Sequence, residues 1–153
     1  MQKINYYMQQ AIKIALSAID KNEVPVGCVI VHNDEIIACE HNMVEKNNNS
    51  TQHAEIIAIN KAMKKLNSKY LDACDIYITM EPCIMCAGAI SHSKIRKVIF
   101  GCYDMNNGCI EHNGKIFSKI KTNHTPEVIG GIEIEKCQKI IKDFFANKRK
   151  DND

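Results

Sequence analysis

The chain has 153 residues, of which 45% are hydrophobic and 25% charged, with only 7 glycines and 3 prolines. These proportions exclude a disordered, collagen-like or low-complexity polypeptide and indicate a single globular domain, which we assign to residues 1–150. The formal net charge of +2 is too small to attract a polyanion globally, so any nucleic-acid contact must come from local basic clusters. The 8 cysteines are the unusual feature, because they suit either a secreted disulfide scaffold or an intracellular metal-binding protein.

The N-terminal stretch lacks the features of an export signal. Gln9, Gln10, Lys13 and Ser17 interrupt its apolar residues, and no small-residue cleavage site follows. No apolar run in the chain approaches the roughly 18 to 20 residues that a membrane span needs. We therefore expect a cytoplasmic protein without a membrane partner, in which most thiols are free.

The first part of the chain predicts a helix followed by a β-hairpin. Apolar residues recur at intervals of three and four positions and indicate an amphipathic helix ending near Asp20; they are Met8, Ala11, Ile12, Ala15, Leu16 and Ile19. Branched residues then predict a buried strand from Val24 to Val31, a turn at 32–34 and a second strand at 35–40. These two strands should pair in antiparallel fashion.

The rest of the chain alternates helices with strands. After a polar loop at 45–52 we expect helices at 53–66 and 83–92, strands at 75–80, 97–101 and 127–131, and a surface excursion at 102–126. A final helix should turn one group of side chains inward: Cys137, Ile140, Ile141, Phe144 and Phe145. This order predicts an α/β protein with three α/β/α layers, in which helices cover both faces of a mixed five-stranded sheet.

Two short fragments at the starts of the predicted helices carry the chemistry. Cys83 and Cys86 form a Cys-x-x-Cys pair at a helix start, where the helix dipole favours the thiolate form that binds zinc. His53 would complete three ligands, and three protein ligands leave the fourth position of a catalytic zinc site open to water. Glu55 would serve as the base that takes a proton from this water and returns it to a leaving group. We expect His53 and Glu55 to converge in an irregular first helical turn.

Each fragment taken alone is compatible with a different role. A Cys-x-x-Cys pair occurs in thioredoxin-like redox sites and as half of a structural zinc site. Cys74, Cys102 and Cys109 are available as a fourth zinc ligand, which would close the site. The thiols that we assign to the apolar core are Cys28, Cys39, Cys74 and Cys137.

The combination His53-x-Glu55 followed by Pro82-Cys83-x-x-Cys86 is the general signature of zinc-dependent nucleobase deaminases. Nearly the whole chain resembles the bacterial tRNA-specific adenosine deaminases of the cytidine and deoxycytidylate deaminase superfamily. The segments that carry this resemblance are NEVPVGCVIV, Asn42, HAEIIAI, EPCIMCAGAISHSKI, VIFGCYD, Asn123-His124 and the terminal DFF. Cytidine deaminases have cysteine at the position of His53, which argues against that branch.

The resemblance implies a cytidine-deaminase-like fold and hydrolysis of adenosine to inosine at the wobble position of a tRNA anticodon. It implies one Zn²⁺ per subunit on His53, Cys83 and Cys86, with Glu55 moving protons between water, the adenine ring and the departing ammonia. It further implies that Asn42 hydrogen-bonds the flipped base. Backbone around Ala54 and the apolar Val26 region would wall the pocket, and Asp104 would lie near a flanking nucleotide.

The resemblance also implies a homodimer that binds the anticodon stem-loop across both subunits. Phosphate contacts would come from basic clusters at 94–97, 115–121 and 148–150. The chain departs from the family where Cys28, Cys102 and Cys109 replace small residues, and where Asn106 lies near a position often occupied by lysine.

Two other functions remain open at this point. One is a free-base or nucleotide deaminase, acting on guanine or cytosine with the same zinc chemistry. The other is a non-catalytic, zinc-stabilised RNA-binding module. Such a module requires a fourth protein ligand and has no need of Glu55 near the metal.

Overall fold

The computed structural model describes residues 2–152, so Met1 and Asp153 lie outside the described residues. The elements follow in the order α1 (Gln2–Ile19), β1 (Gly27–His32), β2 (Glu35–His41), α2 (Ala54–Leu66), β3 (Cys74–Met80), α3 (Ile84–His92), β4 (Lys97–Cys102), α4 (Ile116–Lys119), β5 (Glu127–Ile129) and α5 (Ile134–Asp151). Between Gln2 and Asn152, no helix combines the length and the apolar character needed to cross a lipid bilayer.

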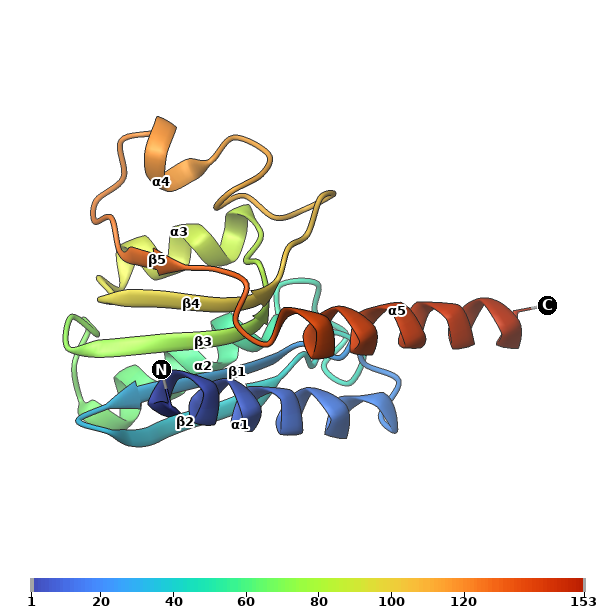
Figure 1. Ribbon diagram of the computed structural model, residues 1–153. Coiled ribbons are helices and arrows are strands. Elements are labelled where there is room, and N and C mark those ends of the chain that lie inside the picture. Colours follow the sequence, from blue (N-terminus) through green and yellow to red (C-terminus); the bar gives the residue numbers. More distant parts are fainter. Residues whose placement is uncertain (1, 153) are drawn as a thin grey trace.

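The strands form one mixed sheet in the order β2-β1-β3-β4-β5 (Figure 1). β1 pairs with β2 and with β3 in antiparallel fashion, whereas β3, β4 and β5 run parallel to one another. Parallel pairing requires crossover connections, and α3 supplies the one between β3 and β4. The predicted mixed five-stranded sheet and α/β class are therefore confirmed.

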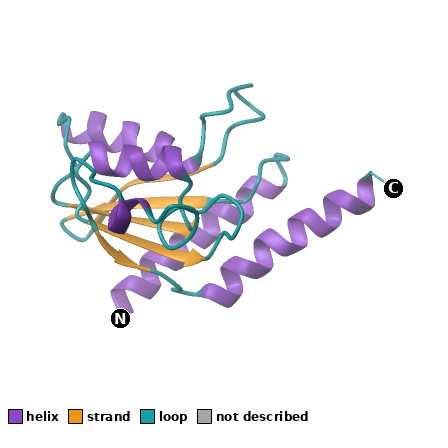
Figure 2. Ribbon diagram, turned by 90° about the horizontal axis from the view of Figure 1, so that it is seen from above, coloured by secondary structure: helices purple, strands orange, loops and turns teal. Residues whose placement is uncertain are grey.

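Helices cover both faces of the sheet, as Figures 1 and 2 show. One apolar cluster joins α2 and α3 to the sheet and contains Ala58, Ile90 and Phe100. The other joins α1 and α5 to the opposite face and contains Met8 and Cys137. Because the central strands are buried on both faces, their sequences are continuously apolar rather than alternating.

The first strand begins later than the sequence predicted. Val26 donates its N–H to the Val24 carbonyl over 2.8 Å, which turns the chain before pairing starts at Gly27. Gly27 is required there by the close approach of α1, since a Cβ at this position would lie 1.9 Å from the Ala11 carbonyl oxygen. The prediction of a strand from Val24 was wrong because local turn geometry overrides branched-residue propensity.

Four residues assigned to the core are exposed instead. Leu16 and Ile19 lie in the last turns of α1, and Phe145 lies in α5. Cys39 is exposed because β2 is an edge strand of the sheet. Helical or strand periodicity predicts a shared face, but only the position of neighbouring elements decides whether that face is covered. The buried positions predicted for Cys28, Cys74 and Cys137 are confirmed.

Candidate active site

The topology brings four chain segments to one edge of the sheet. β2, β3 and β4 end there at His41, Met80 and Cys102, and antiparallel β1 starts there with Gly27 paired to His41. Helices α2 and α3 begin near this edge and direct their N-termini towards it. Carboxyl ends of strands and helix N-termini are the usual location of ligand sites in α/β folds.

Asn42 holds the N-terminus of α2 in place. Its Oδ1 accepts the N–H of Ala54 over 2.8 Å, which satisfies a helix N–H that has no intrahelical partner. This bond fixes the orientation of the side-chain amide. The remaining donor, Nδ2, is therefore left for the pocket that Asn42 lines. His53 is the N-cap residue in extended conformation, so its side chain leaves the helix axis. His53 thus precedes the helix while Glu55 lies in its regular first turn, so the irregular first turn predicted from the His53-x-Glu55 spacing is not observed.

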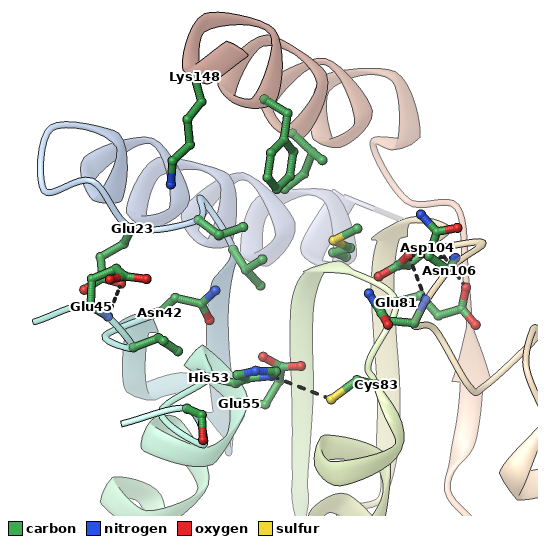
Figure 3. Close-up of a pocket in the computed structure, with 18 of the residues that line it drawn as sticks. Glu23, Asn42, Glu45, His53, Glu55, Glu81, Cys83, Asp104, Asn106 and Lys148 are labelled. Atoms are coloured by element: carbon green, nitrogen blue, oxygen red, sulfur yellow. Dashed lines mark hydrogen bonds between the residues drawn. The ribbon is translucent and has the colours of Figure 1, made fainter. Parts of the chain in front are cut away.

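His53, Cys83 and Cys86 place their ligand atoms within 4.8 Å of one another. Nδ1 of His53 lies 3.6 Å from Sγ of Cys83 and 3.5 Å from Sγ of Cys86 (Figure 3). Ligands at about 2.0–2.1 Å (nitrogen) and about 2.3 Å (sulfur) from a tetrahedral zinc ion are separated by about 3.5–3.6 Å. The separations thus match a zinc site. Among residues 2–152, no fourth His, Cys, Asp or Glu joins this cluster, so Cys74, Cys102 and Cys109 do not close it.

The thiols are tuned for metal binding. Hydrogen bonds from Cys86 and then from His53 lower the pKa of Cys83 to about 4. The same interaction with Cys83 raises the pKa of Cys86, so the pair loses its first proton from Cys83. The hydrogen bond with Cys83 also raises the pKa of His53. These hydrogen bonds therefore favour the thiolate, which is the form that binds zinc.

Glu55 lies beside this cluster on the first turn of α2 (Figure 3). It is buried, and the loss of hydration raises the pKa of its carboxyl above the usual value, although the nearby His53 opposes this shift. A carboxyl with a raised pKa both accepts and donates protons near neutral pH more readily than an exposed one.

A pocket of about 760 Å³ opens onto His53, Glu55 and Cys83. This volume lies within the range of about 300–1,000 Å³ that is typical of small-molecule sites. Its walls combine apolar and polar side chains, among them Val24, Val26, Asn42, Val44, Met80, Asp104 and Phe145.

Comparison with known proteins agrees with this geometry. Residues 1–102 match the cytidine and deoxycytidylate deaminase zinc-binding region. The tRNA-specific adenosine deaminase of Rickettsia typhi is 47% identical over 144 residues, covering 93% of this chain and 97% of that protein. The Bacillus subtilis enzyme of the same name is 41% identical over 150 residues, covering 98% and 93%. The chain belongs to the tRNA-specific adenosine deaminase family.

The fold agreement extends to a solved structure from a study of A-to-I editing by tRNA:A34 deaminases at the wobble position of transfer RNA. That structure superposes with a TM-score of 0.86 and 36% identity, covering 88% of this chain and 98% of the other. The deaminase described here is thus a zinc-binding enzyme with the cytidine-deaminase-like fold, and His53, Cys83 and Cys86 are placed to hold its metal.

The structure places the predicted substrate-binding residues of this deaminase at different depths. Val26, Asn42 and Asp104 line the pocket. Ala54 is not among the residues that line the pocket: it is fully buried, and its N–H donates to Oδ1 of Asn42. Oδ1 of Asp104 accepts the N–H groups of Asn106 and Asn107, each over 3.1 Å, and so orders its own loop.

Glu23, Glu81 and Phe145 line the deaminase pocket but were not among the site residues predicted from the sequence. Glu23 and Glu81 are buried carboxylates that hold loops on opposite sides of the pocket (Figure 3). Glu23 accepts N–H groups from residues 45 and 46 over 3.0 and 2.9 Å. Phe145 and Lys148 reach the mouth from α5. Glu23 and Glu81 could have been suspected from the sequence, because Glu23 directly precedes the first predicted strand and Glu81 directly precedes the Pro82-Cys83-x-x-Cys86 motif. Phe145 was assigned to the core because it continues the apolar pattern of the last helix.

The other basic clusters of the deaminase do not converge on the pocket. Arg96 forms two hydrogen bonds with Asp75, both of 2.9 Å, and Lys94 lies over the ring of Tyr70. His124 contacts the main chain, since its Nε2 lies 2.8 Å from the Ile95 carbonyl oxygen. Of the basic residues considered from the sequence, Lys148 is the one that lines the pocket.

Proposed function

We propose that this protein hydrolyses adenosine to inosine at the wobble position of a tRNA anticodon, consuming water and releasing ammonia. The single observation that carries the proposal is a site of three metal ligands beside the buried carboxyl of Glu55, lining a pocket of about 760 Å³, in a chain of this family. Residues 1–150 would form the one zinc-dependent deaminase domain.

The residues of the chain divide the reaction between them. Zinc, when bound by His53, Cys83 and Cys86, lowers the pKa of water and so supplies a nucleophile near neutral pH. Glu55 would take the proton from water, deliver it to the adenine ring nitrogen, and transfer a proton to the amine as the C6–N bond breaks. Burial raises the pKa of this carboxyl, which makes it a stronger proton acceptor than an exposed glutamate.

Asn42 would orient the base. Its Oδ1 is held by the Ala54 N–H, which leaves Nδ2 as a donor towards an acceptor on the purine ring. Val26 would add an apolar wall, and Ala54 would act indirectly, through the hydrogen bond that fixes Asn42. A base extruded from the anticodon loop is read in such pockets by edge hydrogen bonds and apolar contact.

The RNA outside the pocket would meet polar and basic side chains at its mouth. Asp104 lines the side of the pocket formed by the loop after β4, and Lys148 lines it from α5. We propose that Asp104 lies near a nucleotide flanking the target and that Lys148 contacts a phosphate.

We propose further that the protein is a cytoplasmic homodimer that binds the anticodon stem-loop across both subunits. Two large apolar side chains support a protein contact near the site, since Ile84 is 68% exposed and Met105 is 71% exposed. Sedimentation analysis of the purified protein tests this part: a monomer at micromolar concentration contradicts it, and Ile84→Glu should weaken the dimer.

The experiment for the activity uses purified protein with an anticodon stem-loop that contains adenosine at the wobble position. Inosine and ammonia should appear in equal amounts, with one zinc bound per chain, and a stem-loop with guanosine at the wobble position should release no ammonia. Turnover of free guanine or cytosine without turnover of the stem-loop would overturn the proposal. A zinc-loaded protein that binds RNA but deaminates nothing would identify the chain as a binding module.

A further inference from the structure

One buried carboxylate is hydrogen-bonded to both ends of segment 104–112, which borders the pocket on the side away from Asn42 (Figure 3). Glu81 directly follows β3 and is only 3% exposed. Its Oε2 accepts the N–H groups of Ile110, Glu111 and His112 over 3.1, 2.9 and 3.2 Å. Its Oε1 accepts the N–H of Asp104 over 3.1 Å and lies 2.8 Å from Nδ1 of His112.

The segment approaches Glu81 so closely that only glycine fits between them. A Cβ on Gly108 would lie 2.5 Å from Cδ of Glu81 and 2.6 Å from the Asp104 carbonyl oxygen. Gly108 also forms a β-bridge with Cys83, and Cys109 donates its N–H to the Pro82 carbonyl over 3.0 Å. Segment 104–112 is therefore joined directly to the stretch that supplies a metal ligand.

Glu81 is not available for proton transfer, because hydrogen bonds occupy both of its carboxylate oxygens. Both of its oxygens accept hydrogen bonds from segment 104–112, and it is not a member of the cluster of potential metal ligands formed by His53, Cys83 and Cys86 within residues 2–152. Glu81 instead fixes the segment that forms one edge of the pocket, since Asp104 and Asn106 of this segment line the pocket.

We propose that Glu81 is a positioning residue for RNA recognition: it holds segment 104–112 in the conformation that contacts the nucleotide next to the target adenosine. This inference rests on the proposed function, because the edge has a nucleotide to contact only if the pocket takes a base from RNA. Glu81 acts through Asp104 and Asn106 and does not touch the base.

The test alters the contact between Glu81 and segment 104–112 with two variants, one at Glu81 and one at Gly108. Glu81→Gln keeps the shape but directs an –NH₂ group at backbone N–H groups, whereas Gly108→Ala keeps the carboxylate and forces the segment away from it. Glu135→Gln, an exposed position in the first turn of α5, is the matched control. Hydrogen bonds to a charged group contribute about 1.5–3 kcal/mol each, which corresponds to a factor of about 10–150 in binding.

We expect KM for the anticodon stem-loop to rise by about 10- to 100-fold in both variants, with kcat within about threefold of wild type. Zinc content should stay at one per chain. The wild-type preference among stem-loops with altered flanking nucleotides should be reduced in both variants, which a purely structural role would not cause.

The other outcomes contradict the proposal in recognisable ways. A fall in kcat with unchanged KM, or a loss of zinc, would assign Glu81 to the metal site instead. Failure of both variants to fold would show that Glu81 is needed for the core rather than for the edge of the pocket. If the wild-type protein itself forms no inosine, the proposed function fails; if wild type and control are active and both variants have unchanged KM, only this inference fails.

Discussion

Replacing Glu55 with glutamine separates proton transfer from every other role of this side chain. Glutamine has the same shape, so it leaves no cavity at a position that is only 4% exposed. It cannot cycle a proton between water, the ring nitrogen and ammonia. Because general acid–base catalysis contributes about 10²- to 10⁴-fold, kcat should fall by at least that factor while zinc remains bound.

The stability of the same variant should move in the opposite direction. Burial raises the pKa of Glu55 in the folded protein, so above the unfolded-state pKa of about 4.3 the ionised carboxyl favours the unfolded chain. Each pKa unit of such a shift corresponds to about 1.4 kcal/mol. Zinc-free Glu55→Gln should therefore be at least as stable as zinc-free wild type at pH 7, with the difference shrinking as the pH falls towards 4.3.

Three measurements check this reasoning together. Single-turnover deamination of the stem-loop gives the chemical step, metal analysis gives zinc content, and urea unfolding of the zinc-free proteins gives the free energy of unfolding. Glu135→Gln again serves as the exposed control. Retained turnover in Glu55→Gln would refute the proton-transfer role, and a loss of stability at pH 7 would refute the assigned effect of burial.

Three further predictions concern the cap, the metal and the RNA contact. Asn42→Ala should lower the free energy of unfolding by about 1 kcal/mol, because the N–H of Ala54 loses its hydrogen-bond acceptor. Asn42→Asp should retain the wild-type stability and still lose activity. Equal stability of Asn42→Ala and wild type in urea would contradict the capping role of Asn42. Chelation should lower both activity and the melting temperature, and Zn²⁺ should restore them while Mg²⁺ should not, since the donors are one nitrogen and two sulfurs; recovery with Mg²⁺ would exclude this donor set. Lys148→Ala should reduce the slope of log K against log salt for stem-loop binding by about 0.7–0.9. The control Lys65→Ala, in the last turn of α2, should leave this slope unchanged. Equal slopes for the two variants would show that Lys148 does not contact the RNA.

Local patterns were sufficient for the order of elements and for the metal ligands. The spacing His53-x-Glu55 and Cys83-x-x-Cys86 identified the residues, because zinc chemistry restricts both the donor types and the helix-start positions that favour thiolates. The elements at 53–66 and 83–92 appear as α2 and α3 within one residue of the prediction. The short helix α4 was not predicted, since it lies inside a stretch without apolar periodicity.

Burial of individual residues could not be predicted from the same patterns. Phe145 was grouped with Phe144 on the inward face of the final helix, yet it is 43% exposed whereas Phe144 is 8% exposed. Cys39 continues the apolar run of its strand, yet it lies on the edge strand β2. Periodicity reports which residues share a face, whereas burial depends on elements that are distant in sequence.

The amino-acid sequence by itself determined the metal donors, the residue proposed for acid–base catalysis and the helix starts at which they lie. Only the tertiary structure decided the surroundings of that chemistry. It showed that Asn42 caps the helix carrying Glu55, and that Glu23 and Glu81 hold the loops on the two sides of the pocket. The reason is physical, because a metal site is specified by a few residue types at short spacings, whereas a buried carboxylate is specified by the backbone N–H groups that the fold brings to it from 22 to 31 positions away.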